Sequence, residues 1–78
     1  MQVQGRNIRI LRDFLGYKQA EFAELINVDP SILSEWENDK KIVTAEGIHR
    51  LTEKIPIKPG RLYEVDILKC LKRYFFDQ

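Results

Sequence analysis

The chain has 78 residues, of which 44% are hydrophobic and 32% are charged, a balance typical of a globular domain and not of a disordered one. A chain of this length is near the lower size at which a core is stable without disulfides or metals, so we expect one domain with a compact helical core. The formal net charge is +1, so overall charge does not indicate binding to nucleic acid. Any basic groups that serve such binding must gather on one face.

Cysteine content and hydropathy limit the functions further. Cys70 is the single cysteine, so an internal disulfide and a multi-cysteine metal site are both excluded. No stretch approaches the roughly 18 apolar residues of a membrane span, and the start, MQVQGRNIRI, holds no apolar run of signal-peptide length. We therefore expect a cytoplasmic protein that does not associate with membranes.

The spacing of apolar residues predicts two helices at the start of the chain, over residues 6–15 and 18–26. Gly16 ends the first helix, and Asn27, which tolerates the left-handed backbone, ends the second. Their inward faces consist of Ile8, Leu11 and Leu15 in the first helix and Phe22, Ala23 and Ile26 in the second.

A third helix is predicted directly after the second. Asp29 is its N-cap and Pro30 occupies its first helical position, where a missing N–H group costs nothing. Leu33 and Trp36 point inward. Two short helices joined by so tight a turn must cross steeply, and the small Ala23 stands where the two should approach most closely.

The second half of the chain predicts further helices. Thr44 caps a fourth helix that ends at Pro56, and a fifth begins near Pro59. The last stretch, EVDILKCLKRYFFDQ, has helical spacing, with a strand over Lys72–Phe76 as the alternative.

The stretch QAEFAELINVDPSILSEW carries a resemblance to a known family. Its apolar spacing resembles the helix-turn-helix of lambda-repressor/Cro-like regulators, the Xre group, and VDPSILSEWEN is similar to that family's turn and recognition helix. IRILRDFLGYKQAEFAELI resembles the family's first two helices and HRLTEKIPIKPGRLY its fourth and fifth. The resemblance implies an all-α fold class, a compact bundle of about five short helices with a helix-turn-helix. Residues 1–63 would form the DNA-binding domain and residues 64–78 a C-terminal extension, which we expect to be helical.

The resemblance also implies an internal ion pair. Arg12 and Glu37 stand where the family joins its first helix to the end of its third. The alternative is that each is a solvated surface charge. Such a pair fixes geometry more than it adds stability.

The family inserts its third helix into the major groove of double-stranded DNA, which implies roles for the exposed side of this helix. The candidates for reading bases are Pro30, Ser31, Ile32, Ser34 and Glu35. Ile32 would pack against a thymine methyl, and Glu35 would accept a hydrogen bond from a cytosine amino group. The candidates for contacting phosphates, which position the helix, are Arg6, Asn7, Lys18, Gln19, Asn38, Lys40 and Lys41. An ordinary solvated helix face is the alternative.

The C-terminal extension supplies a candidate dimer surface. We expect a homodimer on a palindromic operator, with half-sites about one helical turn apart. The apolar residues expected at the interface are Val65, Leu68, Leu71 and Phe75. Alternatively, the extension folds back and completes the core of the monomer.

Two functions remain open at this point. The first is a sequence-specific DNA-binding transcriptional regulator, a repressor or control protein. The second is a protein-interaction module, antitoxin-like or an adaptor, which keeps the fold without reading DNA; Glu35 and Asp39 favour it because they place negative charge near a polyanion. An enzyme is not expected, since His49 and Cys70 are isolated and no cofactor motif or metal-ligand spacing is present.

Overall fold

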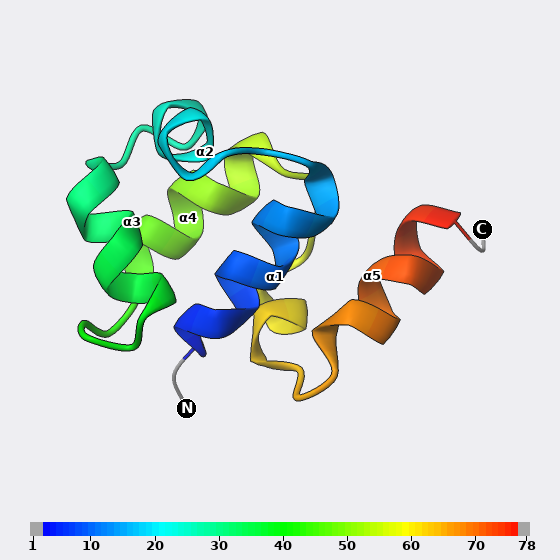
Figure 1. The fold of residues 1–78 in the computed structure, drawn as a ribbon. Coiled ribbons are helices and arrows are strands. Elements are labelled where there is room, and N and C mark those ends of the chain that lie inside the picture. The colour runs from blue at the N-terminus through cyan, green and yellow to red at the C-terminus, as the bar shows by residue number, and fades with distance from the viewer. Residues whose placement is uncertain (1–2, 77–78) are drawn as a thin grey trace.

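The computed structural model describes residues 3–76, and every regular element in that range is helical. The elements are α1 (Gly5–Leu15), α2 (Gln19–Leu25), α3 (Pro30–Glu37), α4 (Ala45–Lys54), the short 3-10 helix η1 (Pro59–Tyr63) and α5 (Ile67–Phe76). Figure 1 shows α1 in the middle of the molecule, with α2, α3 and α4 on one side of it and α5 on the other. The predicted all-α fold is confirmed.

Local side-chain and backbone chemistry sets the helix ends. Gly16 has a φ of 83° and Asn27 a φ of 56°, so both adopt the left-handed backbone that ends a helix. The Asp29 carboxylate caps α3 by accepting a hydrogen bond from the Ser31 N–H at 2.8 Å. Thr44 caps α4 in the same way. These ends coincide with the ones predicted from the sequence.

Two predictions for the second half of the chain need correction. The segment that begins at Pro59 is a 3-10 helix and not an α-helix, since the Arg61 N–H donates to the carbonyl of Lys58, three residues earlier, at 2.9 Å. The alternative of a strand over Lys72–Phe76 was wrong, because these residues continue α5. Among the described residues, no helix is both long enough and apolar enough to cross a membrane.

The core runs through the whole molecule and includes α5. Its apolar side chains without exposed surface are Ile8, Leu11, Phe22, Ala23, Ile26, Leu33, Leu51 and Leu62. Ile67 and Leu71 of α5 are each 1% exposed and belong to the same cluster. The core therefore continues beyond residue 63, where the DNA-binding domain was expected to end.

Leu71 was wrongly placed on an exposed dimer surface. It lies one turn after Ile67 on the face of α5 that joins the core, so it has almost no surface to offer a partner. Val65 and Leu68 are 79% and 43% exposed. The side chain of Phe75 lies outside the described residues.

Trp36 of α3 is held between two glycines that permit very close approach. A Cβ on Gly5 would lie 1.6 Å from the backbone carbonyl oxygen of Trp36, and a Cβ on Gly47 would lie 2.3 Å from its ring. Only glycine fits at either position without a shift of the backbone or the indole. Through these contacts α1 and α4 together fix the orientation of α3.

Candidate nucleic-acid interface

The turn between α2 and α3 is supported from within and from α4. The Val28 N–H donates to the Ala23 carbonyl at 2.9 Å, which reverses the chain immediately after α2. Arg50 of α4 donates to the Asn27 carbonyl at 2.6 Å and pairs with Glu46 at 2.7 Å. Arg50 was not singled out from the sequence, because its partner in the turn is far away along the chain.

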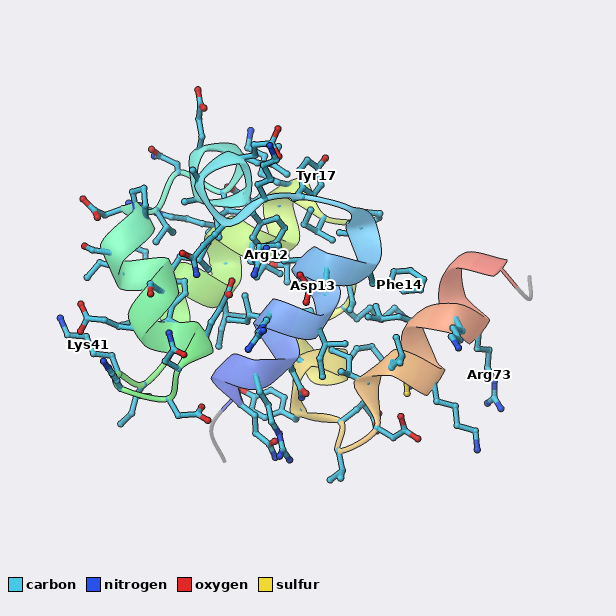
Figure 2. The ribbon with its side chains drawn as sticks, viewed as in Figure 1. Arg12, Asp13, Phe14, Tyr17, Lys41 and Arg73 are labelled. Carbon is cyan, nitrogen blue, oxygen red and sulfur yellow. The ribbon has the colours of Figure 1, made fainter. Side chains whose placement is uncertain are left out.

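Arg12 and Glu37 form a bidentate ion pair between α1 and the end of α3. The Arg12 Nε and Nη2 donate to the two carboxylate oxygens at 2.8 and 3.0 Å, and the Glu37 side chain is only 3% exposed. Figure 2 shows Arg12 extending from α1 toward this part of the molecule. The hydrogen bond with Glu37 raises the pKa of the Arg12 guanidinium, against the opposing effect of its own burial. The charges stabilise each other in a shielded position, so α3 cannot rotate easily about its axis.

The open face of α3 is formed by small polar groups. Pro30, Ser31 and Asn38 are exposed, and Ser34 and Glu35 are half-buried. The Ser31 hydroxyl donates to Asp29 at 2.6 Å. This bond and the one from the Ser31 N–H lower the pKa of Asp29.

Ile32 does not share this open face fully. It is half-buried, packs against the core, and lines a shallow hollow between α3 and α4 together with Val28 and Arg50. Its position follows from helical geometry, because it lies four residues before the buried Trp36. Ile32 therefore lies at the edge of the face, toward α4.

The residues after α3 fold back onto Glu35. Asp39 has a φ of 57°, and the backbone N–H groups of Lys40 and Lys41 both donate to the Glu35 carbonyl oxygen, at 2.8 and 3.3 Å. The Lys41 ammonium also lies 3.4 Å from the Glu35 carboxylate. Figure 2 shows Lys41 at this end of α3, far from α5. The negative charge of Glu35 is thus balanced from within the chain.

The candidate phosphate contacts differ in exposure and in whether their side chains are already hydrogen-bonded within the chain. Arg6, Lys18 and Lys40 are exposed. The Gln19 amide is engaged, since it donates to Glu37 at 3.2 Å. The carboxylate of Glu21 accepts a hydrogen bond from the Lys18 N–H at 2.9 Å and so places an acidic group at the start of α2.

Asn7 was wrongly assigned to phosphate contact. It is 0% exposed, and its side-chain amide donates to the carbonyls of Leu62 and Glu64 at 2.8 and 2.7 Å. It lies one turn before the buried Leu11, so it faces inward and ties α1 to η1.

A polar hollow of about 370 Å³ lies where α1, α2 and α3 meet, beside the open face of α3. Its lining residues are Arg9, Arg12, Gln19, Ser34, Glu37 and Asn38. The Arg9 side chain is 62% exposed and its carboxylate neighbour, Asp13, lies 3.9 Å away. Sequence reasoning missed Arg9, although its spacing of three residues from Arg12 places both on the same side of a helix.

Comparison with known proteins agrees with this arrangement. Residues 5–65 match the family model described as a helix-turn-helix domain. Among solved structures, the chain is similar to the DNA-binding domain of the P22 C2 repressor, with 26% sequence identity and a TM-score of 0.73 over 85% of this chain and 87% of that one. A search of curated proteins found no match. The resemblance drawn from the sequence is confirmed.

Proposed function

This chain belongs to the helix-turn-helix domain family, and we propose that it is a cytoplasmic transcriptional regulator that binds DNA sequence-specifically by placing α3 in the major groove. The observation that carries the proposal is the open face of α3, whose slim polar side chains stand clear of the core. The P22 C2 repressor domain, which shares the fold, is itself a DNA-binding domain.

The contacts around α3 support a defined pose on the duplex. The Arg12–Glu37 pair and the glycine contacts at Trp36 hold α3 rigidly, so its outer groups approach base edges in a fixed register. Ser31 and Ser34 are short enough to let the backbone come close to the bases. Glu35 accepts from a base amino group, and Ile32 at the edge contacts a thymine methyl.

Cations around this face would grip the phosphates and set the register. They come from α1, the start of α2 and the loop after α3, and we assign this role to Arg6, Lys18 and Lys40, with Arg9 beside them. Asn38 and Gln19 add neutral donors, after release from the Ser34 carbonyl and from Glu37 respectively.

We further propose that two copies bind a palindromic operator, each reading one half-site. One short recognition helix contacts only a few base pairs, so a second copy is needed for selectivity. Val65, just before α5, and Leu68, in its first turn, are exposed apolar side chains, and they are the surface we assign to this contact.

Selection of bound sequences from random duplex DNA tests the proposal. We expect one enriched palindromic site, with affinity that falls steeply as salt rises. Lys40→Ala should reduce the slope of log affinity against log salt by about one. Arg73→Ala is the control, because Arg73 is exposed on α5, away from α3 (Figure 2) and on a different side of the helix from Leu68. An absence of enrichment, together with indifference to salt, would refute the proposal.

A protein-interaction module is the second candidate. It is favoured by the acidic groups near the open face, Glu21 at the start of α2 and Asp39 in the loop after α3. Under this alternative the chain binds no DNA sequence selectively, and Lys40→Ala and Lys41→Ala change nothing in the DNA assay.

A further inference from the structure

Glu35 and Lys41 contact each other through both their backbones and their side chains. The Glu35 backbone carbonyl accepts from the Lys41 N–H, and the Glu35 carboxylate lies 3.4 Å from the Lys41 ammonium. Lys40 is joined to the same carbonyl through its backbone, but its ammonium has no carboxylate within 4.0 Å among the residues whose side chains are described. The two neighbouring lysines are therefore not equivalent.

The pair resolves an electrostatic difficulty on the open face of α3. A lone carboxylate that approaches a duplex is repelled by the phosphates and loses its hydration. The Lys41 ammonium cancels that charge locally, yet both groups keep hydrogen-bonding capacity. The carboxylate still has an oxygen free to accept, and the ammonium still has protons to donate.

From this geometry, and resting on the proposed function, we propose that Glu35 and Lys41 together read one C·G base pair in each half-site. Glu35 accepts from the cytosine N4 amino group, and Lys41 donates to O6 or N7 of the paired guanine. Cytosine N4 and guanine O6 are themselves hydrogen-bonded, so they lie about 3 Å apart. That separation resembles the 3.4 Å between the Glu35 and Lys41 groups.

The proposal divides the work of the two loop lysines. Lys41 determines base preference, whereas Lys40 contacts the phosphate backbone and adds affinity without regard to sequence. An A·T pair also offers an amino group, N6 of adenine, to Glu35. Its partner thymine, however, offers Lys41 only the O4 acceptor, with the C5 methyl group beside it, whereas guanine offers the two neighbouring acceptors N7 and O6. We therefore expect C·G to be preferred over all three other pairs.

The test compares the four base pairs at each position of the selected site, using wild type, Lys41→Met, Glu35→Met and the double variant, with Lys40→Met as the matched control. Methionine keeps the apolar stem of lysine and removes its charge. Wild type should prefer C·G at one position of each half-site by roughly ten-fold or more. Each single variant should lose most of that preference, and the double variant should lose no more than either single one.

The control separates the two roles. Lys40→Met should weaken binding to every duplex alike and reduce the salt slope by about one, with the C·G preference intact. If Lys41→Met behaves as Lys40→Met does, Lys41 is a phosphate contact and the inference is wrong. If wild type enriches a site without such a C·G position, the inference also fails while the proposed function stands. If wild type enriches nothing, both fail. Thermal unfolding of each variant confirms that it is folded.

Discussion

Removal of one partner of the Arg12–Glu37 pair should destabilise the protein strongly. In Arg12→Met, the Glu37 carboxylate, 3% exposed, loses both guanidinium hydrogen bonds and keeps the one from Gln19. An uncompensated buried charge costs about 3–5 kcal/mol, and the remaining Gln19 bond places this site at the lower end, about 3 kcal/mol. For a domain of this size, that loss lowers Tm by roughly 12–24 °C.

The double variant Arg12→Met/Glu37→Met separates two roles of the ion pair, fixing the orientation of α3 and stabilising the fold. Two packed methionines leave no buried charge, so we expect the double variant to be more stable than Arg12→Met, with a coupling on the order of 2 kcal/mol in urea unfolding followed by circular dichroism. The double variant should nevertheless bind the selected DNA site more weakly, because methionines do not fix the direction of α3. If the effects of the single variants add to within about 0.5 kcal/mol, the two residues are not coupled and this reasoning is refuted.

Three further predictions concern local contacts. Gly47→Ala should cost about 1–3 kcal/mol in thermal unfolding, because its Cβ would lie 2.3 Å from the Trp36 ring, whereas Gly60→Ala, with nothing within 4 Å, should change Tm little. Asn7→Ala should cost on the order of 2 kcal/mol, since two backbone carbonyls next to η1 lose their donor; a negligible loss in urea unfolding would contradict this. In the folded protein the pKa of Asp29 lies below its ordinary value of 3.8, so the cap stabilises the fold fully above about pH 4. This stabilisation is lost as pH falls through the lowered pKa. Asp29→Asn caps the helix without titrating and should reduce the pH dependence of the free energy of unfolding.

Helix ends could be predicted because their signals are local. Gly16 and Asn27 were expected to take the left-handed backbone, and both do, since that conformation depends on a residue and its neighbours. The turn and the start of α3 were predictable for the same reason, because Asp29 and Pro30 act within one helical turn. The tight turn also predicted a steep crossing of α2 and α3, and the resemblance to the family then supplied the arrangement of the remaining helices, which local signals do not contain.

The errors in the candidate site residues concern contacts between distant segments. Asn7 looked like a surface polar group because nothing nearby in the sequence shows that η1 covers it. Leu71 belonged to a wide apolar band of α5, and the band alone does not indicate which stripe meets the core. The Glu35–Lys41 contact was not predicted, because it depends on the left-handed backbone at Asp39 and on the loop geometry that follows from it.

A net charge of +1 does not argue against DNA binding once the charges are sorted by position. Two carboxylates of α3 are paired within the chain, Glu37 with Arg12 and Glu35 with Lys41. In contrast, Arg6, Lys18 and Lys40 are exposed and, among the described side chains, have no carboxylate within 4.0 Å.

Each unpaired cation that reaches a phosphate releases counterions and contributes close to one unit of salt slope. For a monomer on a half-site we therefore expect a slope of about three, set by these cations and not by net charge. A slope near one would show that the acidic groups around the face, such as Asp39 and Glu21, cancel the field that these cations generate.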